Sequence, residues 1–484
     1  MSHATEGSRS ELAFASFLRA YPTYATTAAL DGLRAREYER LDRCRQVYLD
    51  YTGGSQYAAS QLRAHLDLLN GSVFGNPHST SGPSSAATDR VEAARARVLR
   101  FFHATPDDYL VVFTANASGA LKLVGESYPF APGGRYVLTV DNHNSVNGIR
   151  EFARARGADV TYAPIRMPDL RIDRPALRAL LAQGEPGAAN LFAYPAQSNF
   201  SGVQHPLELV EEARAAGWDV LLDAAAYVPT NAFDLARWRP DFVAVSFYKM
   251  FGYPTGSGCL LLRRDKFAKL RRPWFAGGAV RIASVLAGAV LRPDDATAFE
   301  DGTVDYLNIP AVTIGLDHVE GVGIDKIHER VRCLTGFLLE GMKSLAHRNG
   351  RPVIRLHGPA GTDARGATIA FNVLDAAGVA VDIAQVESLA ARAGISLRVG
   401  CFCNPGVGEV IYGLTAEQVE DLFRIPNLTF DGMRREVRER WGEEVGAVRV
   451  SLGIATNFAD VFRFLQFLEE FRDREPAAGG RADS

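Results

Sequence analysis

The segment DFVAVSFYKMFGYPTG, residues 241–256, decides how this chain is interpreted. Its apolar first part, residues 241–245, predicts a buried strand, and the Gly- and Pro-containing part after Lys249 predicts a turn. Lys249 therefore follows the end of a strand, close to the hydroxyl groups of Ser246 and Tyr248. Most lysines at strand ends are solvated, but a lysine shielded from water becomes a nucleophilic amine. Such an amine can form an imine with a carbonyl cofactor, most commonly pyridoxal phosphate.

Two more polar side chains follow predicted strands. Asp223 ends the apolar run 218–223, and His143 comes just after the run 136–140. Ligands of open α/β sheets lie at the carboxyl ends of the strands, where a carboxylate can keep a pyridinium nitrogen protonated. His143 could stack on the cofactor ring and carry a proton. The alternative interpretations are a helix N-cap for Asp223 and a turn histidine that caps a helix near Ser145.

A turn of small residues, 114–119, joins the predicted strand 110–113 to a helix that begins near Ala120. Such a turn offers free backbone N–H groups and the positive end of the helix dipole to an anion such as a phosphate. The alternative is an ordinary strand-to-helix connection capped by Ser118. Neither a Walker motif nor G-x-G-x-x-G is present here, which disfavours nucleotide binding.

The order of predicted elements indicates an α/β fold. The chain has 484 residues, 47% of them hydrophobic, which is enough for more than one domain. Strands alternate with helices from residue 48 to about 314, as in 135–140 then 146–156 and 190–194 then 207–216. This alternation predicts a mostly parallel sheet.

A smaller α+β domain is predicted after residue 315, from a helix at 323–345, strands at 368–373, 396–399 and 448–452, and a final helix at 458–471. The predicted organisation is therefore a helical segment 1–47 packing on the small domain, a large domain 48–314, a small domain 315–474 and a disordered tail 475–484.

Composition excludes several classes of function. The formal net charge of -3 gives no sign of attraction to nucleic acid or to a membrane surface, and no apolar run is long enough to cross a bilayer. The N-terminus lacks the pattern of a signal peptide, and the five cysteines form no disulfide framework, so we expect a cytoplasmic protein. Cys401 and Cys403 have no matching Cys/His pair, so no metal site is expected.

Taken together, these motifs resemble the class V aminotransferase group of fold type I pyridoxal phosphate enzymes, which includes the cysteine desulfurases. Within that group the chain is most similar to the N-terminal domain of molybdenum cofactor sulfurases. The motifs that carry the resemblance span residues 48–455 in family order: YLD 48–50, GNPHS 75–79, DNHNSV 141–146, YPAQSNFSG 194–202, DAAA 223–226, the Lys249 segment, FEDGT 299–303, GCFCNP 400–405 and RVS 449–451. The resemblance implies a large domain built on a mostly parallel, seven-stranded sheet.

The resemblance also implies a role for each matching residue. Lys249 would form the imine with pyridoxal phosphate, Asp223 would pair with its ring nitrogen, and His143 would stack on the ring. Asn199 would lie near the phenolic oxygen, and four residues would hold the phosphate: Ala117, Ser118, Ser246 and Tyr248. Thr303 would reach the phosphate bound by a partner subunit, which implies a homodimer with shared active sites.

The resemblance assigns the substrate carboxylate to Arg449, with Arg398 as a second candidate. Cys403 matches the loop cysteine that carries sulfur as a persulfide in desulfurases, and a thiolate there would be activated by Arg398. The alternatives for Cys403 are a buried structural cysteine or a relic of sulfur transfer. The chain departs from the desulfurase pattern at Ala226, where a glutamine is usual, and at Tyr248, where a histidine is usual.

Three functions are compatible with these residues. Because the sequence ends without the extra C-terminal domain of full-length sulfurases, we expect an enzyme that acts on a cysteine S-conjugate. It would cleave the C–S bond by β-elimination or combine decarboxylation with oxidative deamination, as in lincosamide antibiotic biosynthesis. The first alternative is a cysteine desulfurase or sulfurase-like sulfur transferase that uses a persulfide on Cys403. The second is a non-catalytic partner protein that binds pyridoxal phosphate.

Overall fold

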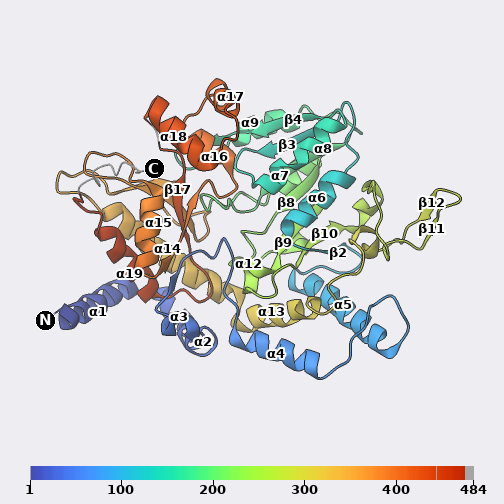
Figure 1. The fold of residues 1–484 in the computed structure, drawn as a ribbon, viewed down its shortest axis with the longest axis horizontal. Helices are drawn as coiled ribbons and strands as arrows, with labels where there is room; N and C mark the ends of the chain where they lie inside the picture. Colours follow the sequence, from blue (N-terminus) through green and yellow to red (C-terminus); the bar gives the residue numbers. More distant parts are fainter. Residues whose placement is uncertain (1, 443, 475–484) are drawn as a thin grey trace.

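The computed structural model describes residues 2–442 and 444–474. Two main sheets organise the chain, with the N-terminal helix α1 at one end of the molecule and a small β-hairpin, β11–β12, projecting at the other (Figure 1). The tail 475–484, which the sequence predicts to be disordered, lies outside the described residues. No helix among the described residues is long and apolar enough to cross a membrane.

The larger sheet has seven strands in the order β2-β10-β9-β8-β7-β3-β4. Only β10 runs antiparallel to its neighbours; β3, β4, β7, β8 and β9 are parallel to one another, so the prediction of an α/β fold with a mostly parallel sheet is confirmed. The bounds are β2 Tyr109–Thr114, β3 Arg135–Thr139, β4 Asp159–Ala163, β7 Asn190–Pro195, β8 Asp219–Asp223, β9 Phe242–Ser246 and β10 Gly258–Arg263.

Both faces of this sheet are buried. Val111 and Phe113 of β2 belong to one hydrophobic cluster, whereas Leu110 and Val112 of the same strand belong to another. Successive side chains of a strand point to opposite faces, so the near-continuous apolar runs follow from helices covering the two sides.

The second sheet has four antiparallel strands in the order β13-β14-β17-β16. Their bounds are β13 Ile354–His357, β14 Thr368–Val373, β16 Arg398–Gly400 and β17 Ala447–Ser451. Beside it, the short strand β1 (Val47–Tyr48) pairs in parallel with β15 (Ile395–Ser396), which brings the start of the large predicted domain against the small one. The remaining short strands are β5 Ile165–Arg166, β6 Arg171–Ile172, β11 Ile282–Ser284 and β12 Ala289–Leu291.

The helices connect and cover these sheets. In the first half of the chain they are α1 Ser2–Ala20, η1 Pro22–Thr27, α2 Ala29–Glu37, α3 Glu39–Arg43, α4 Ala59–Asn70, α5 Gly82–Phe101, α6 Ala117–Ser127, α7 Asn144–Asn147, α8 Ile149–Ala155, α9 Arg174–Leu181, α10 Leu209–Ala215 and α11 Leu235–Trp238. The others are α12 Phe247–Phe251, η2 Arg264–Lys269, η3 Ala296–Phe299, α13 Ile309–Val322, α14 Ile324–Ser344, α15 Ile383–Arg392, α16 Pro405–Ile411, α17 Ala416–Phe423, α18 Phe430–Trp441 and α19 Phe458–Glu469.

Two local predictions differ from the structure. Lys249 lies on the short helix α12, and the predicted turn begins only at Gly252, whose φ of 79° suits glycine. Helix α6 starts at Ala117 rather than near residue 120, because the side chain of Asn116 caps it by accepting a hydrogen bond from Gly119 N at 3.0 Å. The predicted division into domains stays a prediction, and its boundary between residues 314 and 315 falls inside α13.

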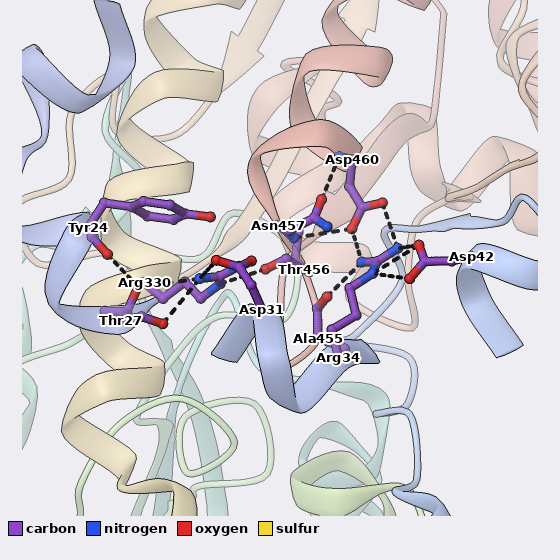
Figure 2. A network of polar contacts seen from close by, with 10 residues as sticks. All are labelled: Tyr24, Thr27, Asp31, Arg34, Asp42, Arg330, Ala455, Thr456, Asn457 and Asp460. Atoms are coloured by element: carbon purple, nitrogen blue, oxygen red, sulfur yellow. Dashed lines mark hydrogen bonds and ion pairs between the residues drawn. The ribbon is translucent and has the colours of Figure 1, made fainter. Parts of the chain in front are cut away.

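Two buried arginines tie the N-terminal helices to the C-terminal part of the chain (Figure 2). Arg34 of α2 donates to Asp42 at 2.8 Å, to the carbonyl of Ala455 at 2.7 Å and to Asp460 of α19. On α14, Arg330 donates to the carbonyl of Thr456 at 3.0 Å and pairs with Asp31. These contacts fix α2 against α14 and α19.

Replacing Arg34 with methionine should lower the apparent free energy of unfolding by about 3–5 kcal/mol, because Asp460 would stay buried without its cation. The matched control is Arg9→Met, which removes the ion pair with Glu469, whose side chains are 58% and 41% exposed. That change should cost less than about 1 kcal/mol. Urea unfolding followed by circular dichroism measures both, and equal effects of the two changes would contradict the role of the Arg34 contacts.

Candidate active site

The predicted cofactor residues meet at the carboxyl edge of the larger sheet. Strands β8 and β9 end at Asp223 and Ser246, while His143 and Asn199 lie four residues beyond the ends of β3 and β7. One pocket at this edge is lined by eight of the predicted residues: Ala117, Ser118, His143, Asn199, Asp223, Ser246, Tyr248 and Lys249. The parallel order of the strands thus gathers side chains that are far apart in sequence.

Lys249 is half-buried in this pocket and makes no hydrogen bond or ion pair with any described residue. Desolvation by the surrounding protein lowers the pKa of its amine, and the positive charges of Arg449 and Arg398 act in the same direction. Asp223 and Cys403 oppose this effect. The net result favours a neutral amine, which is the nucleophilic form.

His143 caps helix α7, because its Nδ1 accepts a hydrogen bond from Ser145 N at 3.1 Å. Burial lowers the pKa of His143, although the negative charge of Asp223 works against that shift. A neutral imidazole that is fixed by a cap has a flat face available for an aromatic ring. His143 therefore has the helix-capping role given above as its alternative interpretation, and it also lines the pocket.

The start of α6 forms one wall of the pocket. Ser246 Oγ accepts a hydrogen bond from Ala117 N at 2.9 Å, and the hydroxyl groups of Ser118 and Ser145 lie 2.6 Å apart. Tyr248 adds a phenolic hydroxyl group to the serine hydroxyls of the same lining. A helix N-terminus with converging hydroxyl donors fits a phosphate, and Asp223 and Lys249 supply partners for a pyridinium nitrogen and an aldehyde. The residues present therefore fit pyridoxal phosphate.

The cationic side of the site contains a carboxylate, Asp50, to which the sequence pattern assigned no function. Arg449 is buried, and it donates to Asn199 O and to Asp50 Oδ1, both at 3.0 Å. Arg398 donates to the other oxygen of Asp50 at 2.6 and 3.0 Å. The motif at residues 48–50 was part of the family resemblance, but nothing in the sequence placed Asp50 between the two arginines.

Cys403 lies on a loop that is anchored against the pocket. Both Phe402 and Cys403 have a φ of 54°, in the left-handed region. The carbonyls of these two residues accept hydrogen bonds from Asn199 Nδ2 and Asn144 N, each at 2.7 Å. The thiol itself is exposed, and it lies close enough to Lys249 and Arg449 for a thiolate there to act on both. The alternative of a buried structural cysteine at this position is therefore wrong.

One predicted cofactor residue, Thr303, lies apart from the Lys249 pocket. Thr303 lines a separate pocket with Thr114 and Gly256, and its hydroxyl accepts a weak hydrogen bond from Asn76 at 3.5 Å. Its role in a partner's site stays a prediction. Cys401 is half-buried, and burial raises the pKa of its thiol, so it is the less reactive of the two loop cysteines. Among the residues that the structure describes, no His, Cys, Asp and Glu side chains cluster as metal ligands would.

The chain is similar to known proteins over most of its length. The family model for aminotransferase class-V matches residues 47–464. The molybdenum cofactor sulfurase of Homo sapiens is 37% identical over 467 residues, covering 92% of this chain and 51% of that protein. The enzyme of the same name from Solanum lycopersicum is 34% identical over 470 residues, covering 91% of this chain and 57% of that protein. The chain thus spans about half the length of the curated relatives it matches.

Solved structures with the same fold include cysteine desulfurases. The apo enzyme of Thermococcus onnurineus NA1 has a TM-score of 0.74 and 22% identity, covering 91% of this chain and 97% of that one. The cysteine desulfurase CsdA of Escherichia coli has a TM-score of 0.71 and 20% identity, covering 91% of this chain and 98% of that one. A variant of the protein C-DES, with glycine covalently linked to its PLP cofactor, has a TM-score of 0.67 and 15% identity, covering 90% and 99%.

Desolvation of Lys249 predicts a specific pH dependence of stability. Because the pKa of Lys249 is lower in the folded protein than its ordinary value of 10.5, the unfolded chain binds more protons between the two values. The stability of the cofactor-free protein therefore rises with pH through this interval and levels off above the ordinary value.

Lys249→Met should accordingly unfold at a higher temperature than the cofactor-free parent near neutral pH, with the difference shrinking as the pH rises. Lys326→Met, at an exposed lysine of α14, is the control and should show no such trend. Calorimetric melting across the alkaline range measures both. A difference for Lys249→Met that does not change with pH would contradict the assignment.

Proposed function

This chain belongs to the class V aminotransferase family, and on that premise we propose that it is a cysteine desulfurase that carries the released sulfur on Cys403. The sequence-based predictions of family, fold and cofactor are confirmed, and pyridoxal phosphate is the cofactor. The prediction of a cysteine S-conjugate substrate in lincosamide biosynthesis has no support among the relatives, which include molybdenum cofactor sulfurases and cysteine desulfurases. The first alternative from the sequence fits better.

The position of the Cys403 loop is the observation that supports sulfur transfer most directly. Its backbone is held by Asn144 at the start of α7 and by Asn199 in the loop after β7, while its thiol is exposed. A cysteine with a purely structural role is usually packed in the interior, whereas Cys403 exposes its thiol on an anchored loop near Lys249. Anchored backbone with a free thiol suits a group that must meet a substrate and later a sulfur acceptor.

In the proposed reaction, pyridoxal phosphate serves as the sink for electrons from the substrate α-carbon. When the cofactor is bound, Asp223 would pair with its ring nitrogen, His143 would stack on its ring, and the start of α6 would hold its phosphate. Lys249, as a neutral amine, accepts the α-proton of L-cysteine at Nζ. Arg449, a buried guanidinium, binds the α-carboxylate.

Sulfur transfer itself requires no oxidant. The Cys403 thiolate attacks the sulfur of the substrate, so an S–S bond forms on Cys403 as the C–S bond of the substrate breaks. The electron pair of the C–S bond stays with the substrate β-carbon, which takes up a proton, and the product is L-alanine. L-Cysteine and a Cys403 thiol thus become L-alanine and a Cys403 persulfide.

We further propose a homodimer, located in the cytoplasm, in which Thr303 reaches the phosphate bound by the second copy. The relatives support the dimer only through family membership.

Cys403→Ser should lower the rate of alanine formation from L-cysteine in the presence of a thiol reductant by about 100-fold or more, because the sulfur then has no acceptor. Cys401→Ser, two residues away on the same loop, is the matched control and should retain most of the activity. Alanine, pyruvate and sulfide are quantified together. Unchanged turnover of Cys403→Ser with pyruvate as product would instead identify a C–S lyase.

A further inference from the structure

The two arginines of the site are direct neighbours across a strand pair. Arg398 of β16 lies opposite Arg449 of β17 in the antiparallel register, so both side chains project from the same face. Two like charges in that arrangement repel each other. The carboxylate of Asp50 lies between them, with Oδ1 3.0 Å from Arg449 Nη2 and Oδ2 2.6 Å from Arg398 Nη2.

The backbone of Asp50 is fixed by both neighbouring strands. Leu49 N donates to Ser396 O at 2.9 Å, and Ser451 N donates to Leu49 O at 2.7 Å. Asp50 itself forms a parallel bridge with Ser451. Its side chain is 11% exposed, whereas that of Arg398 is 52% exposed. Asp50 therefore has a fixed backbone and a mostly buried side chain, and its carboxylate orients the more exposed side chain of Arg398.

The contact between Asp50 and Arg398 also explains why residue 53 is a glycine. A Cβ added at Gly53 would lie 2.5 Å from Asp50 Oδ2 and 2.7 Å from Arg398 Nη2. Gly53 is not in the left-handed region, so backbone strain does not require a glycine here. The space that a side chain would occupy is filled by the ion pair.

Arg449 depends on Asp50 as well. Its Nη1 and Nη2 bond to Asn199 O and Asp50, and its buried Nε has no partner among the described residues. Burial lowers the pKa of Arg449, and Asp50 is the main group that opposes this shift. Without Asp50, one cation would be buried beside another with no carboxylate to separate them.

We propose that Asp50 is a positioning residue that holds Arg449 and Arg398 together as the receptor for the α-carboxylate of the amino acid substrate. With Asp50 ionised, the three side chains carry one net positive charge, which matches a single carboxylate. The ligand class rests on the proposed function. Holding both guanidinium groups in place before the substrate arrives reduces the ordering that binding would otherwise require.

The test compares L-alanine with ethylamine, which lacks the carboxylate, by titrating the holoenzyme and following the absorbance of the bound cofactor. Asp50→Asn should raise the dissociation constant of L-alanine about tenfold or more and leave that of ethylamine within about twofold. Asp50→Glu, which keeps the charge, should restore part of the affinity. With L-cysteine, KM should rise in Asp50→Asn while kcat is largely retained.

Gly53→Ala is a milder variant that disturbs the Asp50–Arg398 contact without removing a charge. It too should weaken the binding of L-alanine but not that of ethylamine. The proposal is overturned if L-alanine binds Asp50→Asn as well as the parent or more tightly, since Asp50 would then be idle or a competitor. Equal weakening of both ligands also overturns it, because the change would then be a general structural one. If the absorbance of the parent holoenzyme does not change with L-alanine, the proposed function itself is contradicted, and this inference with it.

Discussion

Desolvation of Lys249 is the constraint on which the rest of the site depends. An ordinary solvated lysine is protonated at neutral pH and is not a nucleophile. Here the strands β8 and β9 bring the amine to a half-buried position at the sheet edge, where its pKa falls. The nearby charges have to be arranged around that amine, with Asp223 and Cys403 favouring its proton and the two arginines opposing it.

The opposite wall of the site comes from the meeting of the two sheets. Gly202 and Gly406 allow close contact there, because an added Cβ would collide with the carbonyls of Thr368 and Val140, respectively. Arg365 strengthens this junction by donating to Ser201 O at 2.8 Å and to Thr368 O at 2.6 Å. Arg365 has no acidic partner among the residues that the structure describes, and burial lowers its pKa to about 10. These contacts hold the loop after β7 close to β14, and they hold α16, which follows the Cys403 loop, close to the end of β3.

Much of this arrangement was accessible from the sequence. The apolar runs that end at Asp223 and Ser246 predicted strands β8 and β9, because a strand buried on both faces leaves a simple hydrophobic pattern. The role of Asp50 was not accessible, since it depends on the register of β16 and β17. It also depends on ion pairs with Arg398 and Arg449, which lie 348 and 399 positions further along the chain. Hairpin β11–β12 was also missed, because its exposed residues Val285 and Leu286 carry no burial pattern.

A covalent label decides most directly whether Lys249 is the amine that holds the cofactor. The purified holoenzyme would be reduced with borohydride and digested, and the pyridoxyl-phosphate group located by mass spectrometry. If Lys249 holds the cofactor, the protein is yellow, loses its colour on reduction and carries the label on Lys249 alone. A colourless protein after incubation with pyridoxal phosphate, or a label on Lys122, Lys266, Lys269, Lys326 or Lys343, would contradict it.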